Sequence, residues 1–297
     1  MKIGFVGLGN MATAIIGGLL REGTTFSGED GDATVITAAN IIGSAKTEAT
    51  RQKRAEQFGI AVTASNREVA EAADVLVLAV KPQFFPEVIA EIREVVNENT
   101  LVISIAAGLT LERIAALFNR DVTAMRLIRC MPNTPALVNA GCTAVVPGPG
   151  ATEADEALCL RLMESFGRAI VIPERLMDAA SAAAGSSPAF VFMFIEALAD
   201  GAVAAGMPRA QAYEFAAAAV AGSAQLVLET GRHPGDLKDM VCSPGGTTIE
   251  GVKALEEGAF RASVMNAIVA CVEKAKAFRR RKIHTQARSS WKTVQNG

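Results

Sequence analysis

KIGFVGLGNMA, residues 2–12, decides the fold of the first half of this chain. A short apolar run leads into Gly7, Gly9 and Ala12, which have the GxGxxG/A spacing of a dinucleotide-binding turn. The turn follows a predicted strand and opens a predicted helix, which is the context that the motif requires. Gly7 permits the tight turn, Gly9 lets the backbone approach a pyrophosphate, and the helix N-terminus stabilises its negative charge. A glycine turn that holds no ligand is the alternative.

Downstream of this turn, apolar runs alternate with helical patterns. Strands are predicted at 33–39, 60–63, 74–80, 100–108, 122–132 and 141–148. The run DVLVLAV (74–80) is continuously apolar, as in parallel strands that are buried on both faces. Residues 1–172 are therefore predicted to form an α/β domain, a Rossmann-type, doubly wound parallel sheet that binds NAD(P).

The composition changes after Pro173, where alanine dominates and glycine and proline separate helical stretches. We predict an all-helical domain over residues 173–282 and a basic, flexible tail over 283–297. The most apolar segment, residues 188–206, contains Glu196 and Asp200. Because a membrane span tolerates such charges poorly, we interpret this segment as a buried or interface helix.

The overall composition excludes several classes of function. The net charge of -2 argues against nucleic-acid binding, which needs a dominant basic surface. The five cysteines have neither metal-site nor disulfide-framework spacing, so no metal site is expected and a reducing cytoplasm fits. No signal peptide is predicted, because Met1 and Lys2 lead directly into a strand. With only 2 histidines, histidine-based acid catalysis is not expected.

The residues after the predicted second strand bear on the choice of nicotinamide cofactor. This strand is expected to end at Asn40, and the next carboxylate is Glu48. NAD enzymes usually carry an acidic residue at this strand end. A neutral strand end followed by Arg51, Lys53 and Arg54 instead suits the extra phosphate of NADPH, with NADH possible. The alternative for these cations is a solvated helix face.

Four further motifs resemble the pyrroline-5-carboxylate reductase family: AVKPQ (79–83), SIAAGLTLERI (104–114), RCMPNTPALVNAG (129–141) and SPGGTT (243–248). The resemblance runs from Met1 to about Phe278. It implies an oxidoreductase of proline biosynthesis that acts on CH–NH groups. Such an enzyme reduces the C=N bond of 1-pyrroline-5-carboxylate to L-proline with NAD(P)H. It also implies a homodimer formed through the helical domain, with further assembly possible.

The resemblance also implies site residues. The implied cofactor contacts are Gly7, Leu8, Gly9, Asn10, Met11, Asn40, Asn66, Ala79, Val80, Lys81, Pro82, Ala106, Ala107 and Gly108. The implied substrate contacts are Glu174, Ser243, Gly245, Gly246, Thr247 and Thr248. The hydroxyl of Thr248 or Ser181 is expected to hydrogen-bond the ring nitrogen as the catalytic group.

The loop SPGGTT interrupts an otherwise helical region and suits a carboxylate ligand. A glycine-rich turn at a helix N-terminus offers unpaired N–H groups and a favourable dipole. The hydroxyls of Ser243, Thr247 and Thr248 add donors without adding a charge. Since an imine can arrive already protonated, orientation by a hydroxyl is sufficient, and the scarcity of histidine is consistent with this. Without the resemblance, a plain capping turn would explain the loop equally well.

The chain departs from the family pattern in SAAAGSSPAF (181–190) and at Met240. Ser181 replaces threonine, Ser187 replaces glycine, Phe190 replaces tyrosine, and Met240 replaces asparagine. A reductase of a related cyclic imine, or a weakly active or non-catalytic NADP-binding paralogue, therefore stays open. A β-hydroxyacid dehydrogenase is disfavoured, because the helix PAFVFMFIEALADG (188–201) lacks the lysine that such an enzyme needs.

Overall fold

The computed structural model describes the backbone of residues 1–21, 25–27 and 33–294, and the side chains of residues 1–21 and 35–277. The chain divides into two compact units, one of Met1–Gly185 with the segment from Val272, the other of Ser186–Cys271. The expected domain boundary after residue 172 precedes this division and stays a prediction.

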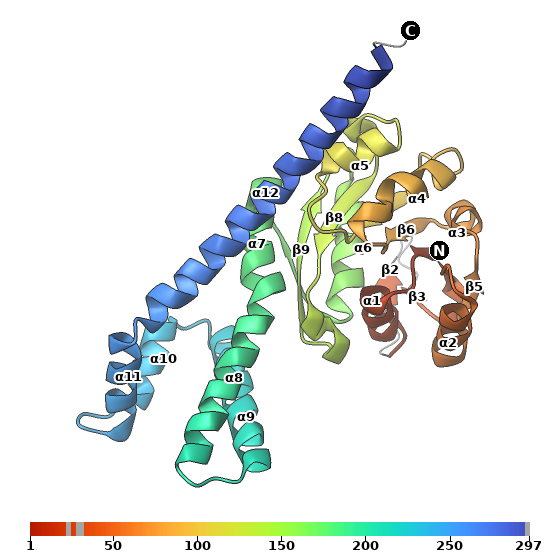
Figure 1. Ribbon diagram of the computed structural model, residues 1–297. Coiled ribbons are helices and arrows are strands. Elements are labelled where there is room, and N and C mark those ends of the chain that lie inside the picture. Colours follow the sequence, from red (N-terminus) through yellow and green to blue (C-terminus); the bar gives the residue numbers. More distant parts are fainter. Residues whose placement is uncertain (22–24, 28–32, 295–297) are drawn as a thin grey trace. The chain divides into compact units, whose positions relative to one another are not determined.

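The first unit is built on an eight-stranded sheet (Figure 1). The strand order is β10-β9-β8-β7-β6-β1-β4-β5, and all neighbours are parallel except β8 and β9. The strands are β1 (Ile3–Val6), β4 (Ile41–Ser44), β5 (Ala61–Thr63), β6 (Val75–Leu78), β7 (Leu101–Ser104), β8 (Leu127–Met131), β9 (Gly141–Pro147) and β10 (Gly167–Val171). Two short strands, β2 (Thr25–Ser27) and β3 (Ala33–Val35), pair separately. The predicted doubly wound α/β fold is confirmed.

The position of the second sheet strand corrects the sequence prediction. The apolar run 33–39 was expected to end this strand at Asn40, but the strand beside β1 is β4, with Ile3 opposite Ile41. No strand was predicted at residues 41–44, where Gly43 interrupts the apolar pattern. A Cβ on Gly43 would lie 2.5 Å from Cδ2 of Leu8, so the glycine allows this side chain to pack closely.

Helices and short turns connect the strands of the first unit. The helices are α1 (Asn10–Arg21), α2 (Glu48–Phe58), α3 (Asn66–Ala72), α4 (Phe85–Ile92), α5 (Leu111–Leu117), α6 (Glu153–Glu164) and α7 (Met177–Ala180). The 3-10 turns are η1 (Ala38–Asn40), η2 (Pro82–Phe84), η3 (Val122–Ala124), η4 (Thr134–Val138) and η5 (Glu174–Leu176), and η6 (Ser181–Ser186) is π-helical. Hydroxyl N-caps begin α2, α3, α5 and α6.

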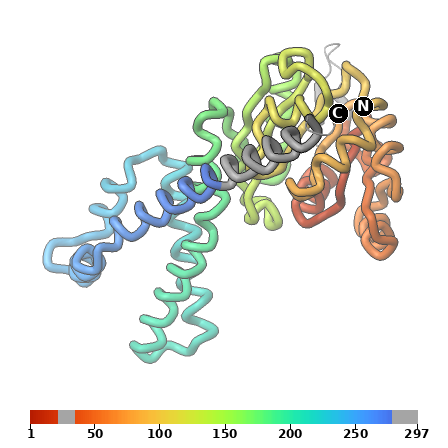
Figure 2. Tube along the Cα trace, turned by 45° about the horizontal axis from the view of Figure 1, so that its top comes forward, coloured from red at the N-terminus to blue at the C-terminus, as the bar shows by residue number. Residues whose placement is uncertain are grey.

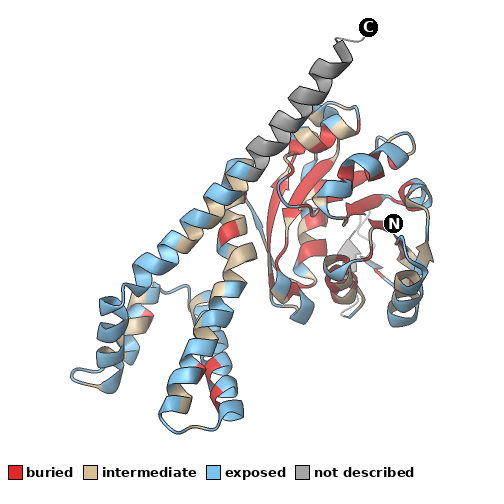
Figure 3. Ribbon diagram, in the orientation of Figure 1, coloured by how far each residue is buried: buried red, intermediate tan, exposed pale blue. Residues whose placement is uncertain are grey.

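Two apolar clusters bury the two faces of the sheet. Phe5 and Ile15 belong to one cluster, whereas Val6 and Phe85 belong to the other. Successive side chains of a strand point to opposite faces, so a strand that is buried on both sides contributes to both clusters. Figure 3 shows this burial along the strands. The sheet therefore forms the rigid base of the first unit.

The second unit is helical. It contains α8 (Ser187–Ala204), α9 (Arg209–Thr230), α10 (Pro234–Val241), α11 (Thr247–Glu257) and the start of α12 (Phe260–Val294). Figure 2 shows the hairpin of α8 and α9, which pack through Ala199, Ala212 and Ala216. The backbone of α12 is helical as far as Val294, so the tail expected from residue 283 does not begin at a helix end.

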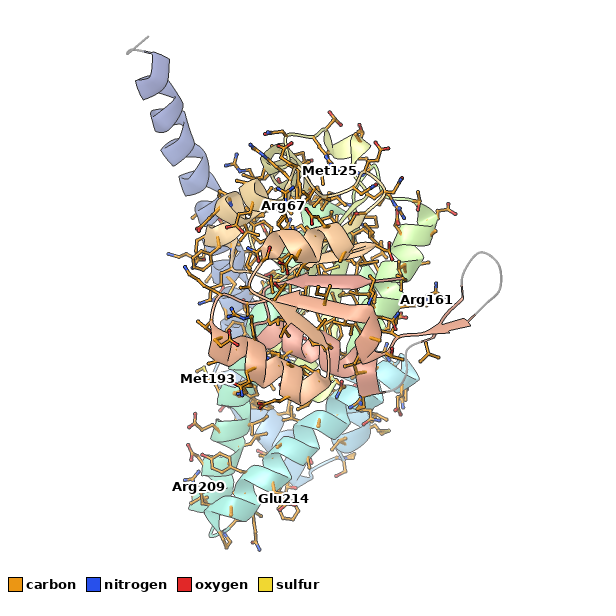
Figure 4. All side chains as sticks on the ribbon, turned by 90° about the vertical axis from the view of Figure 1, so that its right-hand side faces the viewer. Arg67, Met125, Arg161, Met193, Arg209 and Glu214 are labelled. Carbon is orange, nitrogen blue, oxygen red and sulfur yellow. The ribbon has the colours of Figure 1, made fainter. Side chains whose placement is uncertain are left out.

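Large apolar side chains remain exposed on this helical unit. Phe192, Met193, Phe215 and Met265 are all more than 60% exposed, and Figure 4 labels Met193 on α8. Among the described residues, the stretch Glu174–Ala204 is long and apolar enough to cross a membrane by length and composition alone.

Asp155 of α6 provides the first testable prediction. Its carboxylate is 1% exposed, pairs with Arg126 and accepts the N–H of Thr152 at 2.9 Å. Burial opposes ionisation, but the hydrogen bonds from Arg126 and Thr152 outweigh it, so the pKa of Asp155 lies below its usual value. We expect Asp155→Asn to lower the free energy of unfolding by about 2–3 kcal/mol at neutral pH, because Arg126 loses its partner.

The pH dependence of this effect is set by the lowered pKa. The stabilisation is present above the unfolded-state pKa and is lost as the pH falls through the folded-state pKa. Urea unfolding of both proteins should therefore show a difference that is constant near neutrality and shrinks below about pH 4. A difference that stayed constant into that acid range would contradict the ion-pair explanation.

Candidate cofactor and substrate sites

The glycine turn between β1 and α1 has room for a ligand. Gly7 has a φ of +97°, and its N–H donates to the carbonyl of Ser44 at 3.1 Å. No described atom lies within 4 Å of the position that a Cβ on Gly9 would take. The first N–H groups of α1, from Asn10 and Met11, face this loop end and have no partner four residues earlier in the helix. The turn therefore fits the pyrophosphate of a dinucleotide.

Two further predicted segments lie at the same edge of the sheet. Residues 79–82 follow β6 and residues 106–108 follow β7, and both strands run parallel to β1. Val80 lies directly against Gly7, because its Cγ1 would be 2.8 Å from a Cβ there. Gly108 has a φ of +74° and open space around its Cβ position. The carboxyl ends of parallel strands form the crevice in which nucleotides bind in such folds.

Asn66, the first residue of α3, joins this group through a hydrogen-bond chain. Its Oδ1 accepts the Ser44 hydroxyl at 2.7 Å, and its Nδ2 donates to Oε2 of Glu91 at 2.6 Å. Ser44 is 1% exposed and is the last residue of β4. Ser44 was not among the predicted site residues, because the second strand was expected at residues 33–39.

Asn40 lies at the opposite edge of the sheet. It precedes β4, its Nδ2 donates to the carbonyl of Met1 at 3.1 Å, and its Oδ1 accepts the N–H of Thr37 at 2.9 Å. Ligands of this fold bind at the carboxyl edge, so the structure does not bring Asn40 together with the other predicted cofactor residues. Its cofactor contact stays a prediction that the geometry does not favour.

Cations surround the true carboxyl end of β4. Lys46 is exposed two residues after Ser44. Arg51 donates to the carbonyls of Ala45 at 2.8 Å and Lys46 at 3.1 Å. Arg54 donates to the carbonyl of Leu8, in the glycine turn, at 3.4 Å. Leu8 itself is 2% exposed, so only its backbone can face a cofactor. Arg51 also pairs with Glu48. The cations at this strand end are candidates for the counter-charge of an adenosine 2′-phosphate.

Glu174 is engaged within the first unit. Its Oε1 accepts the N–H of Leu111 at 3.0 Å and the Arg129 guanidinium at 3.0 Å. Arg129 is 2% exposed, so this ion pair links β8 to the start of α5. The geometry gives Glu174 a structural role, and its predicted contact with substrate stays a prediction. Ser181 begins the π-helical turn η6.

The loop between α10 and α11 in the helical unit leaves a helix N-terminus open. The N-cap of α11 is Gly246, and no side chain caps it. Gly245 has a φ of +66°, which favours glycine, and the Gly246 N–H donates to the carbonyl of Ser243 at 3.0 Å. That bond occupies the Gly246 N–H. The first-turn N–H groups of Thr247 and Thr248, with their hydroxyls, can instead hold an anion.

The structure brings no metal-ligand cluster together in its described part: no three His, Cys, Asp or Glu side chains gather there. The Sγ atoms of Cys130 and Cys159 lie 3.4 Å apart in the core. The hydrogen bond between them and their burial raise the pKa of Cys130 well above its usual value. A buried protonated thiol is unreactive, so we assign this pair to the packing of α6 on the sheet.

A doubly wound sheet with an open GxGxxA turn defines a dinucleotide-dependent enzyme, and residues 2–108 match the family described as NADP oxidoreductase, coenzyme F420-dependent. Residues 174–278 match the pyrroline-5-carboxylate reductase dimerisation family. The chain belongs to the pyrroline-5-carboxylate reductase family. It is therefore an oxidoreductase with a Rossmann-type nucleotide-binding unit and a helical region of the kind through which the family associates.

Individual relatives agree with this assignment. The pyrroline-5-carboxylate reductase of Escherichia coli is 51% identical over 274 residues, which cover 92% of this chain and 97% of the relative. That of Arabidopsis thaliana is 39% identical, with 93% and 94% covered. The reductase structure from Coxiella burnetii has a TM-score of 0.83 at 33% identity and covers 93% of this chain and 97% of its own. A Plasmodium falciparum pyrroline carboxylate reductase, solved with NADP bound, has a TM-score of 0.79 at 29% identity, with 94% and 98% covered.

Proposed function

We propose that this protein reduces the C=N bond of 1-pyrroline-5-carboxylate to give L-proline with NADPH, and so completes proline biosynthesis. The first unit holds the dinucleotide at Gly7–Met11, and the loop Ser243–Thr248 holds the substrate carboxylate. The observation that carries the substrate assignment is the uncapped N-terminus of α11, which follows the left-handed Gly245. The relatives from Escherichia coli and Arabidopsis thaliana carry the activity in their names.

The carboxylate site works without a protein cation. The N–H groups of Thr247 and Thr248 begin α11, where the helix dipole favours a negative charge. Charge-assisted hydrogen bonds to such N–H groups are stronger than neutral ones. The threonine hydroxyls add donors that carry no charge of their own. A small monocarboxylate therefore suits this loop.

The reaction does not require a strong acid from the protein. When bound, NADPH supplies the hydride that adds to the carbon of the C=N bond. The ring nitrogen arrives protonated from water and keeps that proton as the amine forms. We assign to the hydroxyl of Thr248, with Ser181 as the second candidate, an accepted hydrogen bond from this N–H group. The hydroxyl orients the ring for hydride addition, and orientation is a large part of the rate of such a reaction.

The preference for NADPH over NADH is assigned to the cations after β4. We expect Lys46→Glu to raise the KM for NADPH about 10- to 100-fold, because a charge-assisted contact with the 2′-phosphate is replaced by repulsion. The KM for NADH, which lacks this phosphate, should change little. Steady-state kinetics with both cofactors measure the ratio of the KM for NADPH to the KM for NADH.

Lys53→Glu is the matched control. Lys53 was one of the predicted cations, but it lies exposed on α2, and among the described residues no hydrogen bond joins it to the end of β4 or to the glycine turn. This substitution should leave the ratio of the two KM values unaltered. An equal effect of both substitutions would assign the preference to net charge alone and contradict a local phosphate site.

The exposed apolar side chains of the helical unit support a homodimer that forms through this unit, with further assembly possible. Phe192 and Met193 on α8 and Phe215 on α9 are exposed in the single chain, and residues 174–278 match the family's dimerisation region. We infer that the apolar stretch within Glu174–Ala204 is covered by a second copy and not by a bilayer. A cytoplasmic location and the absence of a nucleic-acid partner belong to the same proposal.

The decisive assay measures NADPH oxidation with three substrates: 1-pyrroline-5-carboxylate, piperideine-6-carboxylate and a β-keto acid. We expect the highest kcat/KM for the five-membered imine. A higher value for the six-membered ring would reassign the substrate to a related cyclic imine. NADPH binding without turnover of any of the three would contradict the proposed activity.

A further inference from the structure

A proline leaves one carbonyl of the π-helical turn without its usual helical donor. In an α-helix the carbonyl of Ala184 would accept the N–H of residue 188. Residue 188 is proline, which has no N–H and lies in the first turn of α8. The α-helical bond to this carbonyl is therefore missing, at a point where the helix is already irregular.

Asn133 supplies a side-chain donor to this carbonyl. Its Nδ2 donates to the carbonyl of Ala184 at 2.9 Å, and its Oδ1 accepts the N–H of Cys142 at 2.8 Å. The side chain is 8% exposed. Because both ends of the amide are bound, its orientation is fixed. Loss of either bond would leave a buried polar group without a partner, which lowers the stability of the fold.

The location of this amide connects it to the nucleotide edge. Asn133 lies two residues after Met131, the last residue of β8, which runs parallel to β7. A Cβ on Gly185 would lie 3.6 Å from Cε of Met131 and 3.6 Å from Oγ of Ser181. The turn that carries Ser181 therefore packs on the segment that carries Asn133.

We propose that Asn133 is a positioning residue for the reduction. It holds the π-helical turn that begins at Ser181 and thereby fixes the direction of the Ser181 hydroxyl. π-helical turns are frequently found at functional sites. The inference rests on the proposed imine reduction.

The test uses a nearly isosteric substitution in the whole protein. Asn133→Asp keeps the acceptor for the Cys142 N–H but places an oxygen against the Ala184 carbonyl. We expect kcat/KM for 1-pyrroline-5-carboxylate to fall about 100-fold, as for a small misplacement of a reacting group. The Kd for NADPH, measured by cofactor fluorescence, should stay within about twofold, because the glycine turn is untouched. Asn133→Ala, which adds no charge, should also lower kcat/KM while leaving the Kd for NADPH nearly unchanged. This variant provides the test if Asn133→Asp does not fold.

Asp155→Asn is the matched control. It makes the reverse exchange, from carboxylate to amide, at a buried position. The partner of Asp155 is Arg126, which directly precedes the first residue of β8. This substitution should lower Tm but leave kcat/KM unchanged. The inference is overturned if the Asn133 variants lose stability while keeping kcat/KM within about threefold of the original, or if NADPH affinity falls in step with kcat/KM. An original protein that reduces no imine would refute the proposed function instead.

Discussion

Gly9→Ala is expected to weaken NADPH binding about 100-fold, because the added methyl group occupies the space into which the pyrophosphate must come. The substitution should not disturb the fold. Gly9 has an ordinary φ, and no described atom lies within 4 Å of the new Cβ. Fluorescence titration gives the Kd, and thermal unfolding without cofactor gives the Tm. A large rise in the Kd with an unchanged Tm identifies a ligand site.

Gly17→Ala on the same helix is the matched control. Its Cβ would lie at an ordinary contact distance of 3.7 Å from Cε1 of Phe58. It should stabilise α1 by about 0.5–1 kcal/mol and leave the Kd for NADPH unchanged. Gly7→Ala is less informative, because a φ of +97° and a clash with Val80 would strain the loop itself. Unaltered NADPH binding by Gly9→Ala would show that the dinucleotide does not use this turn.

Removal of the substrate carboxylate is expected to have the largest effect on turnover. With 1-pyrroline in place of 1-pyrroline-5-carboxylate, kcat/KM should fall about a thousandfold, because two or more charge-assisted hydrogen bonds are lost. The binding energy of this remote group contributes to the rate as well as to KM. Initial rates of NADPH oxidation with both imines measure the loss.

Two valine substitutions separate the roles of the threonines in this comparison. Thr247→Val should lower kcat/KM about tenfold for the carboxylate substrate and little for 1-pyrroline, because it removes a donor to the carboxylate. Thr248→Val should lower both values, because its hydroxyl is assigned to the ring nitrogen. Equal effects of both variants on both substrates would contradict this division, and unchanged turnover by Thr248→Val would exclude a role at the nitrogen.

Local signals predicted most of the nucleotide-binding unit correctly. The GxGxxA turn and the alternating apolar runs each depend on neighbours in sequence, and the structure has β1, α1 and the parallel sheet where they were expected. The second strand was misplaced because β4 is short and contains Gly43. The reason for that glycine is the packing of Leu8, a contact between distant residues that no local pattern reveals.

For the candidate sites too, local sequence patterns revealed some features, and contacts between distant residues were not predictable. The loop at residues 243–248 was recognisable because its glycines and hydroxyls interrupt a helical pattern. The roles of Glu174 and Asn133 were not, since their partners Arg129 and Ala184 lie 45 and 51 residues away in sequence. Pro188 lies in the first turn of α8, a position that accepts proline. No local pattern indicated the π-helical turn before it or the Asn133 bond to Ala184.

A crystal structure of the protein with NADP⁺ and L-proline tests the central claim most directly. We predict that the proline carboxylate lies within hydrogen-bond distance of the backbone N–H groups of Thr247 and Thr248, with the Thr248 hydroxyl near the ring nitrogen. A carboxylate bound instead by an arginine or lysine side chain, away from residues 243–248, would contradict the account.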